Sequence, residues 1–381
     1  MRSVILTSPF DAFAGSLDET LLWLCTIPSP IGEEDAICDA IQARLQKEDL
    51  PAPIRRYGNS LVVPLTRAPD GERRPRIALV GHLDTVRTEN GPARVDGDRV
   101  YGAGAADMKS GLAVMIALAE TARALLPCDV TLVFYAREEG PYDGNELGPV
   151  LEQDPELPHV DLAVCLEPSD NRLQLGCNGS LHATVTFEGR TAHSSRPWQG
   201  DNAIVKAAPL LAELGRLAPE DHVIDGHTYR AVISATQGRD GGRGRNVVPD
   251  SFSLNVNYRF PPDVSLDEAE AHLRALVAGP AHEHGWEGPE PRVEITDRSP
   301  AAPPNGNHPL ITKLIAAGVK AVEPKQAWTD VARFAVRGIP AVNFGPGENA
   351  QAHQKNESTS LALIHEGFHI VKRWLLSLSN G

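Results

Sequence analysis

The sequence predicts an α/β protein in which a mixed, largely parallel sheet lies between helices and a small α+β domain is inserted. Three observations predict this fold class. Short apolar runs alternate with helical segments over the first part of the chain, as in sheets that helices cover on both faces. Near Gly176 the pattern changes to alternating apolar and polar positions. After about position 298 the first pattern returns, so one domain is interrupted by the other.

The first part of the chain contains helices and buried strands in alternation. Apolar positions at helical spacing predict two helices before the first strand, and an Ala- and Leu-rich stretch predicts a longer helix after it. Short runs of β-branched and aromatic residues predict three buried strands. The helices are expected at 17–25, 34–45 and 109–126, and the strands at 77–80, 130–136 and 162–166.

The inserted part has the pattern of an antiparallel sheet with one apolar face. Over Phe252–Phe260 every second residue is apolar, and polar residues occupy the positions between them. Ser265 and Glu268 have the spacing of a capping box, which predicts a helix from there to about Val277. Another helix is expected over 202–217. Together these elements predict a small α+β domain.

The last stretch of the chain returns to the first pattern. Helices are expected at 310–322 and 360–376, with a strand at 341–344 between them. The domain boundaries follow from these changes of pattern. Residues 1–177 and 298–381 are predicted to form one domain, and residues 178–297 the inserted one.

Composition and charge exclude several classes of protein. The chain has 381 residues, of which 41% are hydrophobic and 23% charged, and this ordinary usage excludes disordered and fibrous classes. Every apolar run is shorter than the ~20 residues that cross a bilayer. A formal net charge of −14 argues against a protein whose main task is to grip nucleic acid, because phosphates attract basic surfaces. Neither a membrane nor a nucleic-acid partner is expected.

Two features of the chain predict a cytoplasmic location. The apolar stretch Val4–Leu6 near the N-terminus is too short for the core of a signal peptide. The five cysteines are odd in number and contain no Cys-x-x-Cys pair, so neither a disulfide framework nor a cysteine-rich zinc site is indicated. Cys165 lies in an apolar run and is expected to be a small buried side chain.

Acidic residues or a histidine follow each of the three apolar strands of the first part. Because ligands bind at the carboxyl ends of strands in open α/β sheets, these side chains are expected to converge in space. Two more candidates precede the long helix or follow the strand at 341–344. In chain order the candidates are His82, Asp84, Asp107, Glu138, Glu139, Glu167 and His353.

This set of side chains predicts a divalent metal site. Gathered carboxylates repel one another, and each is harder to ionise when no positive charge lies nearby. A mixed set of imidazoles and carboxylates with few thiols suits zinc, with cobalt or manganese as substitutes. The metal site is therefore expected at the carboxyl edge of the sheet.

Each motif taken alone has an ordinary structural interpretation. His82-Leu83-Asp84 after a strand is more often a turn or a helix cap than a pair of ligands. Glu138-Glu139 alone is more often a solvated loop end, and Glu167-Pro168 alone could merely end a strand. The glycine-rich segment 102–111 lacks both common phosphate-loop patterns, so nucleotide binding is not indicated. The metal interpretation depends on the joint occurrence of these motifs.

The same motifs carry a resemblance to a known family. They are Gly81-His82-Leu83-Asp84-Thr85-Val86, Tyr101-Gly102-x-Gly104-x-x-Asp107-Met108-Lys109-x-Gly111, Glu138-Glu139-Gly140, Leu166-Glu167-Pro168 and Gly189-Arg190-Thr191-Ala192-His193-Ser194. Over essentially the whole chain they resemble the dinuclear zinc aminoacylase/carboxypeptidase/desuccinylase family. Segments 198–204, 328–334 and 343–347 look like the actinobacterial type of succinyl-diaminopimelate desuccinylase within it. The resemblance implies a zinc-peptidase catalytic domain with an inserted lid and dimerisation domain.

The resemblance also implies a role for each residue of the metal site. The ligands would be His82 and Glu167 for one zinc ion, Glu139 and His353 for the other, and Asp107 as the bridge between them. Asp84 would hydrogen-bond to the far ring nitrogen of His82 and fix its tautomer. Glu138 would be the general base that takes a proton from water and passes it to the leaving amine. A cis peptide bond after Asp107 is implied as well.

The resemblance further implies contacts with substrate, both in the inserted domain and in the chain that follows it. His193 would donate to the oxyanion from the partner subunit, which implies a homodimer and domain closure. Arg259 would bind a substrate carboxylate, for which the forked guanidinium is suited. Asn246 and Thr329 match positions that contact substrate. Three further arginines, whose contact with substrate the sequence leaves open, are Arg196, Arg245 and Arg333.

The implied reaction is hydrolysis of an amide. The resemblance implies that N-succinyl-L,L-diaminopimelate and water are converted to succinate and L,L-diaminopimelate, in lysine and cell-wall precursor synthesis. Acetylornithine deacetylase, aminoacylase and glutamate carboxypeptidase of the same family remain alternatives, because they differ in the pocket for the acyl group or side chain. A catalytically silent binding relative is the alternative of another class, and the complete set of metal-site residues argues against it.

Overall fold

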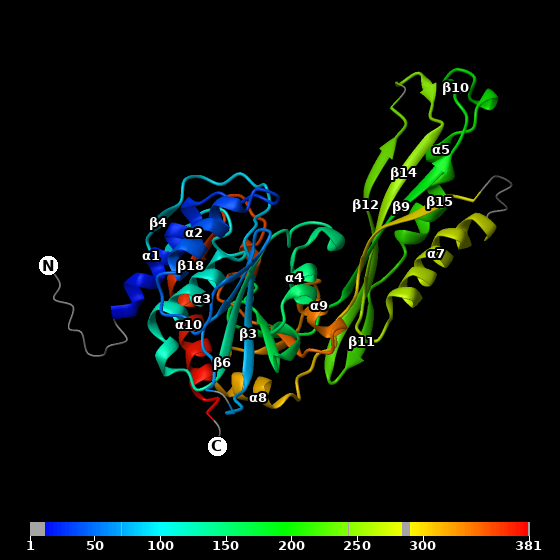
Figure 1. Ribbon diagram of the computed structural model, residues 1–381. Coiled ribbons are helices and arrows are strands. Elements are labelled where there is room, and N and C mark those ends of the chain that lie inside the picture. Colours follow the sequence, from blue (N-terminus) through cyan, green and yellow to red (C-terminus); the bar gives the residue numbers. More distant parts are fainter. Residues whose placement is uncertain (1–11, 70, 243, 284–289, 380–381) are drawn as a thin grey trace. The chain divides into compact units, whose positions relative to one another are not determined.

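The computed structural model describes residues 12–69, 71–242, 244–283 and 290–379, and the chain divides into two compact units (Figure 1). Unit 1 consists of Met1–Gly176, Pro304–Glu323 and Arg333–Gly381, and unit 2 of Cys177–Pro303 and Pro324–Ala332. The N-terminal stretch Val4–Leu6 lies outside the described residues.

The sequence-based boundaries differ from this division at three places, because residue 177, residues 298–303 and one inner segment all group with unit 2. Residues 324–332 were expected in the first domain, but they group with unit 2. Two hydrogen bonds within unit 2 explain the difference. Cys177 Sγ donates to the carbonyl oxygen of Thr329 at 3.6 Å, and Trp328 Nε1 donates to that of Pro300 at 3.0 Å. These hydrogen bonds join residues that lie far apart in the sequence, so a local sequence pattern does not predict them.

Unit 1 is built on an eight-stranded sheet. In spatial order its strands are β1 (Arg55–Tyr57), β2 (Ser60–Pro64), β6 (Asp129–Tyr135), β3 (Arg76–His82), β7 (Leu162–Cys165), β17 (Ala341–Asn343), β8 (Leu173–Leu175) and β16 (Val322–Pro324). The four central strands, β6, β3, β7 and β17, run parallel, β2 pairs antiparallel with β6, and β8 pairs antiparallel with β17. β3 is buried from Ile77 to His82, which explains its continuous apolar run, since central parallel strands face protein on both sides.

Helices cover both faces of this sheet. Figure 1 shows α1 (Ala12–Thr26), α3 (Lys109–Thr121) and α10 (Leu361–Leu376) together on one face and α4 (Leu147–Gln153) on the other. α3 is buried along Lys109–Ala119, because it contacts α1, α10 and the sheet. The remaining helices are α2 (Asp35–Leu45), which contacts β2, α8 (Pro309–Ala316), which contacts α10, and α9 (Val331–Val336).

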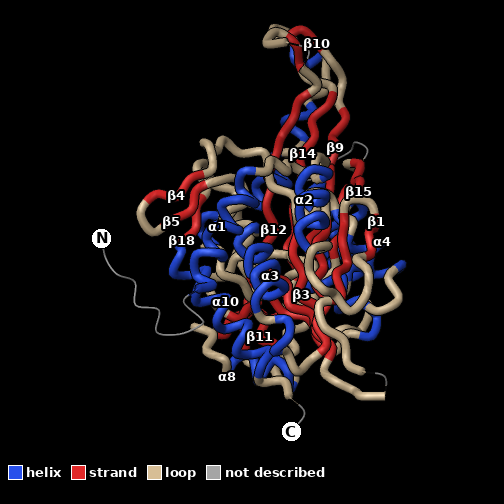
Figure 2. The backbone as a smooth tube through the Cα atoms, turned by 60° about the vertical axis from the view of Figure 1, so that its left-hand side comes forward, coloured by secondary structure: helices blue, strands red, loops and turns tan. Residues whose placement is uncertain are grey.

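A separate three-stranded sheet joins two segments that lie far apart in the sequence. It consists of β4 (Arg94–Asp96), β5 (Arg99–Tyr101) and β18 (Ser358–Ser360). Ser358 pairs with Tyr101 in an antiparallel ladder, and Figure 2 shows the three strands side by side. The loop that follows β5 therefore lies beside the segment that precedes β18.

The described part of unit 2 contains a five-stranded antiparallel sheet and three complete α-helices. The strands are, in spatial order, β11 (Glu220–Ile224), β12 (His227–Asp240), β14 (Ser251–Phe260), β9 (Gly179–Glu188) and β15 (Arg292–Ser299), and the helices are α5 (Ala203–Lys206), α6 (Ala208–Leu214) and α7 (Leu266–Glu283). The predicted apolar face of β14 packs in the core of the unit through Leu254, Val256 and Phe260. The capping box is confirmed: Ser265 N donates to Glu268 Oε2 at 2.9 Å, and Glu268 N donates to Ser265 Oγ at 3.2 Å.

Two predicted helices end earlier than the sequence pattern suggests. The helix expected over 310–322 ends at Ala316, because Gly318 follows with a left-handed φ of +108° and the chain then enters β16. The single helix expected over 202–217 is divided into α5 and α6. Pro209 lies in the first turn of α6 and has no N–H group, so it cannot continue the hydrogen bonds of α5.

Two structural findings bear on the protein's surroundings. Among the helices of the described residues, none combines the length and the apolar character that spanning a bilayer requires. All five cysteines are buried with free thiols, and the predicted burial of Cys165 is confirmed.

Candidate metal centre

The predicted metal-site residues converge in unit 1, at the carboxyl ends of neighbouring strands. His82 is the last residue of β3, Glu138 and Glu139 follow β6, and Glu167 follows β7. Three overlapping groups bring one ligand-capable atom of each member within 4.8 Å of the others. These groups are His82, Asp107 and Glu167; His82, Glu138 and Glu139; and Asp107, Glu139 and His353. The expected convergence at the sheet edge is therefore present in the structure.

Asp107 lies between the two histidines of the cluster. Its Oδ1 is 3.1 Å from His82 Nε2, and its Oδ2 is 3.5 Å from His353 Nε2. His353 Nε2 also lies 3.0 Å from Glu139 Oε1. The two oxygens of one carboxylate thus face two different imidazoles, which is the arrangement that a ligand shared by two ions requires.

The electrostatics of the cluster favour a cation. Burial lowers the pKa of His82, but its hydrogen bond with Asp107 and the charge of Glu167 raise that pKa well above its usual range. The hydrogen bond with Glu139 raises the pKa of His353 to about 9, against the effect of burial. In both places a histidine is drawn toward its charged form by carboxylates around it. A divalent ion would supply that positive charge, so imidazoles and carboxylates at these distances fit a metal.

Asp84 has a different contact from the one that the family resemblance implies. The backbone carbonyl of Asp84, not its carboxylate, lies 3.0 Å from His82 Nδ1, and the nearest carboxylate oxygen is 3.7 Å away. The carboxylate instead accepts the backbone N–H groups of Glu138 at 3.0 Å and Glu139 at 2.9 Å. A carboxylate with two N–H donors in reach is better satisfied there than by one imidazole.

Glu357 is a buried residue of this region that the sequence pattern did not single out. Its carboxylate accepts backbone N–H groups from the loop that carries Asp107. Burial raises the pKa of Glu357 to about 7, although those hydrogen bonds lower it. Its position four residues after His353 was the only signal in the sequence.

The implied cis peptide bond between Asp107 and Met108 is present.

The residues expected to contact substrate lie in unit 2. His193 is exposed in β10 (Ala192–His193), which pairs with β13 (Val247–Val248), and Ser194 N donates to the carbonyl oxygen of Asn246 at 2.9 Å. Arg259 is half-buried on β14, where its Nε donates to Asn257 Oδ1 at 3.1 Å. Thr329 is buried. His193 and Asn246 are therefore neighbours.

The three arginines that the sequence left open have different surroundings. Arg333 is buried in unit 1, where its guanidinium lies 3.8 Å from the centre of the Tyr142 ring and donates to the carbonyl oxygen of Tyr142. These contacts give Arg333 a packing role between α9 and the segment before α4. Arg196 and Arg245 are exposed in unit 2.

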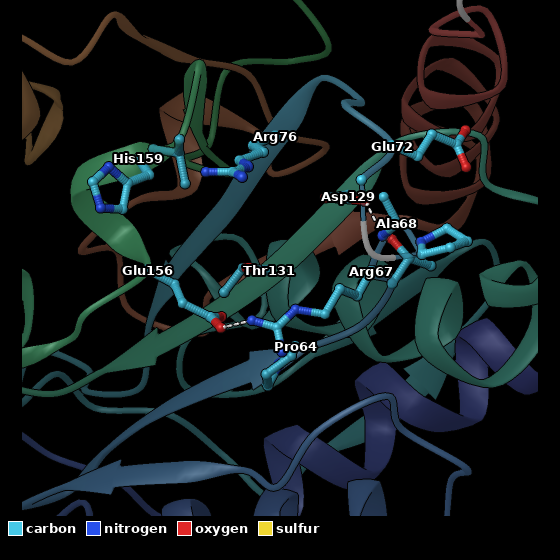
Figure 3. Close-up of a pocket in the computed structure, with 13 residues that line it drawn as sticks. Pro64, Arg67, Ala68, Glu72, Arg76, Asp129, Thr131, Glu156 and His159 are labelled. Atoms are coloured by element: carbon cyan, nitrogen blue, oxygen red, sulfur yellow. Dashed lines mark hydrogen bonds and ion pairs between the residues drawn. The ribbon is translucent and has the colours of Figure 1, made fainter.

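A cavity of about 490 Å³ in unit 1 lies at the amino-terminal ends of strands β3 and β6, opposite to the ends that carry the metal-site residues (Figure 3). Arg76 and Asp129, which line it, are the first residues of β3 and β6, whereas His82 is the last residue of β3. β3 is seven residues long, so its two ends lie roughly 20 Å apart. Arg67 in the cavity wall is paired with Glu156. This cavity is therefore separate from the candidate metal centre.

Comparison with known proteins identifies a family and named relatives. Residues 78–377 match the model of peptidase family M20/M25/M40. A succinyl-diaminopimelate desuccinylase of Corynebacterium glutamicum is 36% identical over 357 residues, which are 92% of this chain and 94% of that protein. A Mycobacterium tuberculosis protein named as a succinyl-diaminopimelate desuccinylase is 38% identical over 353 residues, which are 92% of this chain and 96% of that protein.

Solved structures with the same fold cover nearly the whole chain. A tripeptidase of Staphylococcus aureus superposes with a TM-score of 0.78 at 20% identity, over 96% of this chain and 98% of that one. The YXEP protein of Bacillus subtilis, described as a dinuclear metal-binding peptidase, superposes with a TM-score of 0.69 at 16% identity, over 96% of this chain and 98% of that one. At these identities the likeness shows the fold.

Proposed function

This chain belongs to peptidase family M20/M25/M40, and from that premise we propose that it hydrolyses N-succinyl-L,L-diaminopimelate to succinate and L,L-diaminopimelate. The reaction would serve lysine and cell-wall precursor synthesis. The observation that carries the proposal is that relatives with 36–38% identity over 92% of the chain bear the name of this activity. The cluster of imidazoles and carboxylates in unit 1 supplies the side chains that a metal-dependent amide hydrolase needs.

The metal centre is proposed to hold two zinc ions, with cobalt or manganese as substitutes. His82 and Glu167 would hold one ion, Glu139 and His353 the other, and Asp107 both. The contacts of Asp107 support this division, because its two oxygens lie 3.1 Å and 3.5 Å from different histidines. When bound, such ions polarise the carbonyl group of an amide and lower the pKa of water.

Glu138 is proposed to move the proton in the reaction. Its carboxylate would take a proton from the attacking water and deliver it to the leaving amine. Two observations support this role. Glu138 lies in the cluster with His82 and Glu139, and its backbone is fixed by the hydrogen bond to Asp84. Its neighbour Glu139 faces His353, so the two adjacent carboxylates have different tasks.

Unit 2 is proposed to bind substrate and to form a homodimer. His193 of one subunit would donate to the oxyanion that forms in the other, and Arg259 would pair with a substrate carboxylate. Asn246 and Thr329 would complete the contacts with substrate. Large apolar side chains exposed on unit 2 support a homodimer, since a partner surface would cover them. They are Trp198, Ile204, Val205 and Leu211.

A cytoplasmic location is proposed for the enzyme. The five free, buried thiols support it, because disulfides are rare in reducing compartments. The proposed substrate is a small molecule, and neither a membrane nor a nucleic acid is proposed as a partner.

The proposed substrate can be tested with purified enzyme and added Zn²⁺. We expect kcat/KM for N-succinyl-L,L-diaminopimelate to exceed that for N-acetylornithine by about 100-fold or more, because a buried site that pairs the extra carboxylate rejects substrates that lack it. A preference for N-acetylornithine, an N-acyl amino acid or a glutamate-terminated peptide would overturn the substrate. A protein that neither hydrolyses any of these nor retains metal after dialysis would be a silent relative.

A further inference from the structure

The loop Gly102–Asp107, which brings Asp107 to the metal centre, is held by one side chain from the opposite end of the chain. Glu357 is buried, with 2% of its surface exposed. Its Oε2 accepts the backbone N–H group of Gly104 at 2.9 Å. Its Oε1 accepts those of Ala106 and Asp107, both at 2.8 Å. One carboxylate therefore gathers three N–H groups of the loop, including that of Asp107 itself.

Glu357 is fixed at its own backbone as well. Its N–H group donates to Asn90 Oδ1 at 2.8 Å, and its carbonyl oxygen accepts the N–H group of Gly102 at 3.0 Å. The next residue, Ser358, begins β18, which pairs with β5 just before the loop (Figure 2). The carboxylate is thus anchored on a sheet rather than on a free loop end.

The path of the loop turns its N–H groups toward the protein interior. Gly104 has a φ of +77°, and a Cβ atom there would lie 2.7 Å from a methyl group of Thr85. A side chain at this position would therefore be strained and crowded. Lys109 N donates back to the carbonyl oxygen of Gly104 at 2.7 Å. A loop so tightly turned needs an acceptor on its inner side, since buried N–H groups are costly without a partner.

A buried carboxylate has a higher desolvation cost than a neutral acceptor that would serve structure alone. A buried ionised group costs several kcal/mol unless hydrogen bonds and opposite charge offset it. Three charge-assisted bonds offset it here, and the charges of Glu357 and the buried Lys109 act on each other. Lys109 in turn donates from Nζ to the carbonyl oxygen of Ile27 at 2.9 Å. The gain from a carboxylate is a loop backbone fixed at three donors, Gly104, Ala106 and Asp107.

We propose that Glu357 is a positioning residue of the metal centre, which fixes the backbone at Asp107 so that its two carboxylate oxygens face His82 and His353. The proposal rests on the proposed function, because it assumes that metal ions bind this cluster. Glu357 acts through Asp107 and is not itself a ligand. Since functional side chains must be held to within about 0.5 Å, release of this loop would weaken both metal positions together.

The test is Glu357→Gln, which keeps the size of the side chain. The amide has one accepting oxygen in place of two, and its NH2 group faces a loop N–H group, so the loop loses part of its anchor. We expect the affinity of the metal-free variant for Zn²⁺ and Co²⁺, measured by competition with a chelating dye, to fall about 10- to 100-fold. The visible absorption spectrum of bound Co²⁺ should change, and kcat should fall while KM changes little.

A matched control separates positioning from general stability. Asp154 is also buried in unit 1, and its Oδ1 accepts two backbone N–H groups, of Glu156 at 2.9 Å and Leu157 at 3.1 Å. It belongs to none of the candidate metal groups of the described residues. Asp154→Asn should lower the unfolding temperature of the metal-free protein but leave Zn²⁺ affinity and the Co²⁺ spectrum unchanged.

A second variant keeps the proposal testable if Glu357→Gln does not fold. Asn90→Ala removes the acceptor for the N–H group of Glu357 and leaves the carboxylate in place. We expect a smaller loss of Zn²⁺ affinity in the same direction, with the same change in the Co²⁺ spectrum. Wild-type metal affinity in both variants, or in a folded Glu357→Gln alone, would overturn the positioning role. Failure of the metal centre itself would show differently, because the wild-type protein would then bind no metal.

Discussion

The carboxylate of Asp84 accepts the backbone N–H group of Glu138, with 3.0 Å between Oδ1 and the nitrogen. Its other oxygen accepts the N–H group of Glu139 at 2.9 Å. Asp84 follows β3 and the two glutamates follow β6, and these strands are parallel neighbours with His82 opposite Tyr135. One buried side chain therefore fixes the backbone of two acidic residues of the candidate metal centre.

Replacement of Asp84 by Asn should impair both stability and turnover. The NH2 group of the amide cannot accept an N–H group, so one of the two backbone donors is left buried without its partner. We expect the free energy of unfolding to fall by about 1–3 kcal/mol, measured by denaturant titration. We also expect kcat to fall with KM little changed, because the Glu138 backbone is released. As a matched control, Asp161→Asn affects an acceptor for Arg76 N at the other end of β3 and should leave kcat unchanged. Wild-type kcat in Asp84→Asn would contradict the positioning effect.

The adjacent residues Glu138 and Glu139 should respond differently to the same substitution. Glu138→Gln should lower kcat by about 10²- to 10⁴-fold, the usual contribution of a general base, while the bound metal measured after dialysis stays at the wild-type level. Glu139→Gln should lose metal, because this carboxylate faces His353 in the cluster. Each variant serves as the control for the other. The reverse result, with metal lost from Glu138→Gln, would mean that base and ligand have been exchanged.

The positions of several metal-site residues could be predicted because strands β3, β6 and β7 are short apolar runs with clear ends. His82 is the last residue of β3, Glu138 follows β6, and Glu167 follows β7. Central parallel strands are buried on both faces, so their sequence shows the element and its end directly. The order of strands in space then brings the ends together. A pattern read along the chain is sufficient for this part of the site.

Other features depend on contacts that no local pattern reports. The carboxylate of Asp84 could accept from an imidazole or from two backbone N–H groups, and only the path of the chain after β6 decides between them. Glu357 is an ordinary acidic residue in the sequence, and its role follows from the pairing of β18 with β5. The end of α8 at Ala316 depends on the left-handed Gly318 and on the sheet edge that β16 joins.

The buried cysteines predict how thiol reactivity depends on pH. Burial raises the pKa of Cys25, Cys38 and Cys128 to about 12 and that of Cys177 to about 11. An unperturbed thiol titrates near pH ~8.5, so the native thiols should react with a disulfide reagent far more slowly at pH 9 than the same thiols in denaturant.

The raised pKa values of the buried thiols also predict how the free energy of unfolding depends on pH. Because the folded pKa values lie above the unfolded ones, the folded thiols hold their protons more tightly, and their contribution is complete below about pH 8.5. It is lost as the pH rises from there toward 12. Unfolding free energy measured from pH 8 to 10.5 should therefore decrease. Rapid modification of several thiols in the native protein at pH 8 would contradict the buried positions.

The proposed use of His193 across a dimer interface can be tested by mixing two inactive variants. Glu138→Ala lacks the base but keeps His193, and His193→Ala lacks the oxyanion donor but keeps Glu138. If each site takes His193 from the partner subunit, a mixed dimer contains one complete site and one that lacks both groups. Random reassociation at equal amounts should then restore about a quarter of wild-type kcat, because half of the dimers are mixed and each has one of two sites. Mixed dimers isolated with two affinity tags after co-expression should have about half of wild-type kcat. If each subunit uses its own His193, no mixed dimer contains a complete site and the mixture stays inactive.

Mixing Glu138→Ala with Glu138→Gln is the control, since neither arrangement restores a site there. A monomeric protein in sedimentation, with turnover that does not respond to mixing, would overturn the shared site.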